Sequence, residues 1–150
     1  MAGEIRFKRV SGNSDLPLPA YQTPGAAGMD LCAFLPDGPV IFEHGQFAMI
    51  STGFCVELPS GTEMQIRPRS GLALKHGLIL PNSPGTVDED YRGCVMVGLY
   101  MLGRVPFTIR HGDRIAQAVI AEVRRFRAVE VAEMSDTVRG AGGFGSTGTR

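Results

Sequence analysis

The sequence predicts an all-β fold, an antiparallel sandwich or barrel with one short helix and a glycine-rich C-terminal tail. Short apolar runs recur along the 150 residues, and turn-forming residues separate them. The 20 glycines and 10 prolines are scattered between these runs, which suits many short strands better than long helices. A chain rich in strands with a single helical segment favours an antiparallel architecture over an alternating parallel α/β fold.

The expected strands follow one another from the N-terminus to residue 123. They cover residues 5–10, 40–42, 47–50, 54–58, 64–66, 78–80, 95–101, 107–109 and 115–123. Turns such as Pro59-Ser60-Gly61 separate them. The helical piece spans 71–75 and begins after Ser70, a favourable N-cap residue. Residues 77–93 are expected to form a hairpin with an irregular tip.

The chain is expected to form one domain with a tail. From Arg139 to Arg150 the composition changes abruptly to glycine with a few small polar residues. Such a segment has too few core-forming side chains to order itself. We therefore expect a β-barrel domain over residues 1–138 and a flexible glycine-rich tail over residues 139–150.

Charge and hydropathy exclude several classes of partner. Lys plus Arg and Asp plus Glu number 15 each, so no overall electrostatic attraction to nucleic acid or membrane is expected. No apolar run approaches the ~18 residues of a membrane span, and the N-terminus lacks a signal-peptide core. Cys32, Cys55 and Cys94 are widely spaced, which is typical of reduced thiols in a cytoplasmic protein.

The tail has the chemistry of a phosphate-binding loop. Glycines let backbone amides approach an anion, Ser146 and Thr147 add hydroxyl donors, and Arg139 can bind a phosphate in a bidentate manner. Phe144 offers a flat surface for a base. The alternative is a frayed C-terminus, and the GxxxxGK[ST] pattern is absent.

A second anion-binding candidate precedes the helix. In Pro68-Arg69-Ser70-Gly71-Leu72, Arg69 leads into a helix N-terminus, where free amides and the dipole attract anions. The alternative is a plain N-cap with a surface arginine.

The segment 77–93 carries the acidic residues Asp88, Glu89 and Asp90. If the segment is extended, Asp88 and Asp90 point to one face, where one carboxylate can orient and deprotonate a water. The alternative is a solvated acidic turn. Two further segments, AAGMDL at 26–31 and GDRIAQ at 112–117, place Asp30 and Gln117 beside strands. A turn-forming Asp and a sheet-surface Gln are their simpler interpretations.

Together these five segments resemble the five motifs of the trimeric dUTPase family, in order and with similar spacing. They read AAGMDL, PRSGLA, GTVDEDYRG, GDRIAQ and RGAGGFGSTG and span residues 26–148. Single motifs are weak, but five in register are specific. Two departures are mild: Cys94 follows Gly93 where a polar residue is common, and Pro84 is unusual after Asn82-Ser83. Neither occupies a position assigned to the chemistry.

The resemblance implies a jelly-roll-like antiparallel β-barrel that forms a homotrimer, with active sites at the subunit interfaces. It implies hydrolysis of dUTP to dUMP and pyrophosphate with Mg²⁺, which keeps uracil out of DNA and supplies dUMP for dTMP synthesis. A dCTP deaminase, which shares the fold but releases ammonia, is the nearest rival. A non-catalytic nucleotide-sensing module on the same fold is the other, and the presence of both Asp30 and Asp88 argues against it.

The resemblance also implies roles for individual residues. Asp88 resembles the general base that aims a water at the α-phosphorus, and Asp30 resembles the residue that holds the metal through water. The uracil and deoxyribose are expected to contact Asn82, Val87, Tyr91 and Phe144. The phosphates are expected to contact Arg69, Ser70, Gly71, Gln117, Arg139, Ser146 and Thr147. Tyr91 resembles the residue packed under the deoxyribose, where it excludes the extra hydroxyl of UTP.

Overall fold

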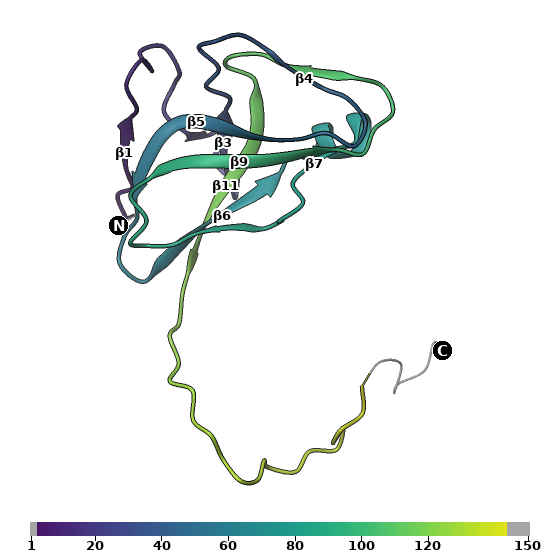
Figure 1. Cartoon of the computed structure of the whole chain (residues 1–150). Coiled ribbons are helices and arrows are strands. Elements are labelled where there is room, and N and C mark those ends of the chain that lie inside the picture. The colour runs from purple at the N-terminus through teal and green to yellow at the C-terminus, as the bar shows by residue number, and fades with distance from the viewer. Residues whose placement is uncertain (1–2, 144–150) are drawn as a thin grey trace.

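The structure, a computed structural model, describes residues 3–143 and confirms the all-β fold. Most of its elements are short strands joined by turns (Figure 1). In chain order the elements are β1 (Arg6–Arg9), β2 (Ala20–Tyr21), β3 (Met29–Cys32), β4 (Val40–Phe42), β5 (Phe47–Glu57), β6 (Thr62–Pro68), η1 (Leu72–His76), β7 (Leu78–Ile79), β8 (Gly85–Val87), β9 (Cys94–Met101), β10 (Phe107–Ile109) and β11 (Arg114–Glu122).

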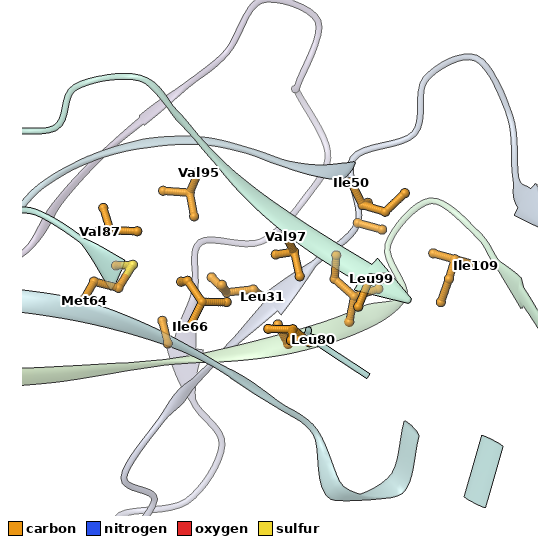
Figure 2. Packing of buried hydrophobic residues seen from close by; sticks show 14 of the residues in the cluster. Leu31, Ile50, Met64, Ile66, Leu80, Val87, Val95, Val97, Leu99 and Ile109 are labelled. Atoms are coloured by element: carbon orange, nitrogen blue, oxygen red, sulfur yellow. The ribbon is translucent and has the colours of Figure 1, made fainter. Parts of the chain in front are cut away.

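Two antiparallel sheets enclose the core in a jelly-roll-like barrel. One sheet has the strand order β1-β5-β9-β7, and the other has the order β2-β3-β11-β6-β8. A third sheet pairs β10 with β4. In β9, Val95, Val97 and Leu99 are at most 2% exposed, whereas Met96 between them is 39% exposed. This period-two alternation directs one face of β9 toward Leu31 and Ile66 of the opposite sheet, as Figure 2 shows.

The expected strands are largely confirmed, with one merger and three additions. Residues 47–50 and 54–58 are parts of one long strand, β5, in which Gly53 adopts a φ of 75° at a break in the pairing with β9. The sequence analysis missed β2, β3 and β8 as strands. They have two to four residues each, too few for an alternating pattern to stand out from turns.

Two local expectations are wrong. Residues 77–93 do not form a hairpin, because β7 pairs with β9 of one sheet and β8 pairs with β6 of the other. The segment therefore crosses between the sheets. The short helix expected at 71–75 is present as η1, a single π-helical turn, but its N-cap position is Gly71, without a side-chain cap hydrogen bond. Ser70 is thus not the cap, and so short a helix contributes little dipole.

After β11 the chain leaves the barrel. Residues 123–143 form an arm without a strand or helix, which extends away from the sheets in Figure 1. The arm carries several exposed apolar side chains: Phe126, Val129, Val131, Met134 and Val138. In the part of the chain that the structure describes, no helix is long and apolar enough to cross a membrane.

The core accounts for the stability of the barrel, and two leucines test this. Leu99 is 0% exposed between the sheets, whereas Leu74 on η1 is 86% exposed. We expect Leu99→Ala to lower the free energy of unfolding by about 2–5 kcal/mol, because it removes buried methyl groups and leaves a cavity. The matched control Leu74→Ala should change it by less than about 0.5 kcal/mol. Urea denaturation measures both, and equal effects would contradict the assigned core.

Candidate active site

One polar cavity gathers five of the residues expected at the site. It has a volume of about 530 Å³ and lies where β3, β11 and the β6–η1 connection meet. Asp30, Arg69, Ser70, Gly71 and Gln117 all line it. Three segments that are far apart in sequence therefore converge, since β11 pairs with β3 on one side and β6 on the other. Lys75 and His76 of η1 also line this cavity, and the sequence analysis did not assign them.

An ion cluster forms the floor of this cavity. The carboxylate of Asp30 lies between two arginines, with Oδ1 3.2 Å from Arg69 Nε and Oδ2 3.2 Å from Arg114 Nη1. The Asp30 side chain is only 14% exposed. Arg69 Nη1 also donates to the backbone carbonyl of Arg114 at 3.0 Å. Two cations surround one carboxylate, so the cluster keeps a net positive charge that suits an anionic ligand.

Gln117 is held against the backbone of the neighbouring strand. Its Nε2 donates to the carbonyl of Pro68 at 2.9 Å. On the other side, a Cβ at Gly28 would come within 2.8 Å of Gln117 Oε1. Glycine at position 28 therefore leaves the space that the Gln117 side chain occupies.

A separate, smaller cavity contains the expected base. It has a volume of about 160 Å³, and Val87, Asp88 and Tyr91 are among its lining residues. Asp88 is exposed and begins a turn in which its carbonyl accepts a hydrogen bond from Tyr91 N at 3.1 Å. The backbone therefore turns at 88–91, and an extended alternation of Asp88 and Asp90 does not describe it. The Val87 side chain is 9% exposed and belongs to the core as well.

The ring of Tyr91 is fixed beside this turn. Its hydroxyl donates to the carbonyl of Cys94 at 3.0 Å. A Cβ at Gly93 would lie 2.4 Å from the Tyr91 hydroxyl oxygen, so only glycine permits this approach. Tyr91 is 43% exposed and lines the smaller cavity. Asn82 lines a third small cavity together with Val87, beside the Ser83–Pro84 peptide, which is cis.

The cavity that Arg69 lines and the cavity that Asp88 lines lie at opposite ends of β6. Asp88 follows Val87, which is paired with Met64 near the start of β6, whereas Arg69 follows Pro68 at its end. The strand between Met64 and Arg69 has a length of roughly 16 Å at about 3.3 Å per residue. The expected base and phosphate-binding residues are therefore not brought together in one cavity of a single chain.

The tail residues are only partly described. Arg139 lies on the exposed arm, where its Nε donates to the carbonyl of Gly142 at 2.9 Å. It therefore does not reach the polar cavity of its own chain. Phe144, Ser146 and Thr147, which we expect to bind base and phosphates, lie outside the described residues.

Glu89 anchors the turn that carries Asp88. Its Oε2 accepts a hydrogen bond from Gly61 N at 2.8 Å and lies 3.7 Å from Arg125 Nη2. The hydrogen bonds from the Gly61 amide and the Ser60 hydroxyl lower the pKa of Glu89 below its ordinary value of 4.5. The turn that carries Asp88 is therefore tied to the β5–β6 turn by a carboxylate that favours its charged form.

Comparison with known proteins shows which family the chain resembles over most of its length. The family model described as dUTPase matches residues 14–148. The chain is 60% identical over 145 residues to a deoxyuridine 5'-triphosphate nucleotidohydrolase of Caulobacter vibrioides, covering 96% of this chain and 94% of that protein. It is 58% identical over 150 residues to the enzyme of the same name from Desulfotalea psychrophila, covering 99% of each.

Solved structures of dUTPases have a similar fold. The Staphylococcus bacteriophage 80alpha dUTPase with dUPNHPP superposes with a TM-score of 0.83 at 26% identity, covering 98% of this chain and 99% of that one. An aspartate-to-asparagine mutant of the dUTPase from phage phi11 of S. aureus shares the fold, with a TM-score of 0.77 at 20% identity, covering 87% of this chain and 98% of that one. The fold likeness therefore extends over nearly the whole chain.

The anchoring of the Asp88 turn has a pH signature. Because the folded pKa of Glu89 is lowered, its ionised form stabilises the protein at pH values above 4.5, and this contribution disappears as the pH falls through the folded pKa. We expect Glu89→Gln to lower the Tm at neutral pH and the difference from the parent protein to shrink as the solution is acidified. Thermal melts across pH measure it, with Glu133→Gln on the arm as control. A difference that does not depend on pH would contradict the assignment.

Proposed function

The chain belongs to the dUTPase family and hydrolyses dUTP to dUMP and pyrophosphate, and on that premise we propose that Asp88 is the general base. An ionised carboxylate can orient a water and accept its proton as the oxygen attacks the α-phosphorus. The bond from that phosphorus to the bridging oxygen then breaks, and pyrophosphate leaves. Because aspartate is a weak base, most of the rate enhancement is assigned to positioning and to charge stabilisation.

The polar cavity is the proposed phosphate site. Arg69, Ser70, Gly71 and Gln117 line it, and its arginines outnumber its carboxylate. Guanidinium groups bind phosphate oxygens in a bidentate manner. Their positive charge reduces the electrostatic repulsion between the triphosphate and the carboxylate that positions the water. This cluster is the observation that supports phosphate binding most directly.

Mg²⁺ is the proposed cofactor, held mainly by the triphosphate. Within residues 3–143 no group of three or more His, Cys, Asp or Glu side chains is placed to hold a metal ion. A single carboxylate in the phosphate cavity, Asp30, fits a metal that keeps its waters and binds through substrate phosphates. Asp30 would then orient one of those waters. When bound, the ion supplies positive charge to the phosphate oxygens.

The smaller cavities are the proposed nucleoside site. Tyr91 is fixed by the hydrogen bond from its hydroxyl to the Cys94 carbonyl. Its ring would pack under the deoxyribose and leave no room for a ribose hydroxyl. Asn82 would read the uracil edge, with Val87 beside it. Attractive contacts alone separate substrates that differ by one methyl by only about 1–3 kcal/mol, so rejection of thymine is assigned to steric exclusion.

We propose that a homotrimer completes the active site. Asp88 and Arg69 line different cavities, which supports a site drawn from neighbouring subunits. The apolar arm at 123–143 supports contact with another copy, because exposed apolar side chains mark interaction surfaces. Fully extended, its 21 residues reach at most roughly 70 Å. The tail at 139–150 would then close over a neighbour's site, with Arg139, Ser146 and Thr147 on the phosphates and Phe144 on the uracil.

The proposed setting is the cytoplasm. The three cysteines are free, which is the ordinary state of thiols in a reducing compartment. The formal net charge of zero gives no reason to expect nucleic acid as a partner.

The role of Asp88 is tested by Asp88→Asn, which keeps the shape but removes the proton acceptor. We expect kcat for dUTP to fall by about 10²–10⁴-fold, because that is the usual contribution of a general base. Affinity for dUTP should be retained. Pyrophosphate release with Mg²⁺ and calorimetric binding measure the two quantities.

Asp90→Asn, two residues away in the same turn, is the matched control and should retain turnover. A substrate panel of dUTP, UTP, dTTP and dCTP is run beside it, and only dUTP should be processed well. Normal turnover by Asp88→Asn would refute the base assignment, and comparable rates for UTP or dTTP would refute the steric selectivity.

The shared site is tested by mixing two inactive variants. Asp88→Asn and Arg69→Gln subunits are denatured, combined one to one and refolded together. If one site takes Asp88 from one subunit and Arg69 from another, random assembly restores both residues in about a quarter of the sites. Activity should recover to that fraction of the parent protein. No recovery in trimers shown to be mixed would mean that both residues act from the same chain.

A further inference from the structure

We propose that Arg114 is a positioning residue that acts through Asp30 to fix the phosphate-binding guanidinium of Arg69. The inference rests on the proposed function, since it takes the polar cavity to be the phosphate site. Arg114 lines that cavity beside Arg69 and Gln117. Above, Arg114 counts only as one of the two cations beside Asp30, without a role of its own.

The contacts form a chain that ends at Arg69. The Arg114 Nη1 donates to Asp30 Oδ2 at 3.2 Å, and the other oxygen of Asp30 lies 3.2 Å from Arg69 Nε. Each carboxylate oxygen therefore has its own arginine. A carboxylate bound on one side only can rotate with its partner, whereas one bound on both sides presents a fixed oxygen. The Arg114 side chain thus sets the direction in which Asp30 holds Arg69.

A second contact also holds the Arg69 guanidinium, in addition to the one from Asp30. Arg69 Nη1 donates to the backbone carbonyl of Arg114 at 3.0 Å. A guanidinium has five N–H donors, so Arg69 can keep both contacts and still bind a phosphate. The charge of Arg114 also matters. With Arg69 alone, Asp30 would neutralise the cluster, whereas with Arg114 the cluster keeps one positive charge for the ligand.

The backbone of β11 shows how Arg114 reaches the cavity. Residues 114 and 117 are an odd number of positions apart, so a regular strand would direct their side chains to opposite faces. The register shifts between Arg114, paired with Cys32, and Ala116, paired with Leu31. Ile115 and Ala116 are consecutive residues and both are buried in the core. This bulge places Arg114 and Gln117 on the same cavity, and bulges commonly redirect side chains next to active sites.

The test compares Arg114→Gln, Arg114→Lys and the control Arg110→Gln, which changes an exposed arginine in the preceding turn. The backbone carbonyl at position 114 remains in every variant, so the comparison isolates the side chain. We expect Arg114→Gln to lower kcat/KM for dUTP by about tenfold through misplacement of Arg69. Arg114→Lys should recover part of the loss because lysine keeps a positive charge beside the Asp30 carboxylate. Affinity for deoxyuridine, which has no phosphate, and the Tm should stay unchanged.

A double-mutant cycle with Asp30→Asn separates positioning from direct contact. If Arg114 acts through Asp30, adding Arg114→Gln to Asp30→Asn should change kcat/KM by less than about twofold. A full tenfold loss in that background would mean that Arg114 binds phosphate itself and would overturn the proposal. Equal behaviour of Arg114→Gln and Arg110→Gln would overturn it as well. Turnover by the parent chain and its loss in Asp88→Asn are judged separately, so the proposed function can stand if this inference fails.

Discussion

The antiparallel pairing of β11 with β3 and β6 is the constraint on which the site depends. This one strand has Asp30 opposite Gln117 on one side and Arg67 opposite Gln117 on the other. Segments that are separated by tens of residues along the chain are therefore held at the spacing of adjacent strands, about 4.8 Å. The ladder hydrogen bonds hold the backbone, so the contacts among the charged side chains have only to set the directions of their end groups. Buried neighbours such as Ile115 and Ala118 keep the strand in register, because a slip of one residue would turn them outward.

The same sheet explains why the expected site residues of a single chain lie in two separate cavities. Arg69, the proposed phosphate-binding residue, follows the end of β6, and the strand that precedes Asp88 pairs near the start of β6. A strand is stiff, so this separation cannot be closed by side-chain rotation. Pairing with another copy solves the problem without deforming the barrel, and the exposed apolar arm beyond Glu122 supplies side chains that a lone barrel leaves in water. The stiffness of β6 thus supports a site shared between copies of the chain.

Sequence reasoning predicted the class of fold and the long strands, since alternation in segments such as 95–101 reflects a core on one face. It missed β3 and β8, whose pairing is decided by neighbouring strands and not by their own three or four residues. The hairpin at 77–93 was wrong for the same reason, because the apolar runs at its two ends pair with different sheets. The motifs identified Asp30, Arg69 and Gln117, which the structure brings into one cavity. Arg114 stood inside one of them, yet period-two alternation gave no sign that it shares a face with Gln117.

Arg114, which sequence reasoning missed, shows how a chain with a formal net charge of zero can have a locally positive cavity. Regular alternation would turn Arg114 to the core face of β11 that Ala116 occupies, and the one-residue bulge turns it instead to the side of Gln117. There it becomes a partner for Asp30, so the cavity has two guanidinium groups around one carboxylate. Lys75 adds a further cation from η1. Electrostatic attraction for a triphosphate therefore needs no basic surface, only a local excess of cations within a few ångströms of the ligand. Backbone irregularity and charge excess are thus linked, because the register shift that disturbs the ladder also places the second arginine.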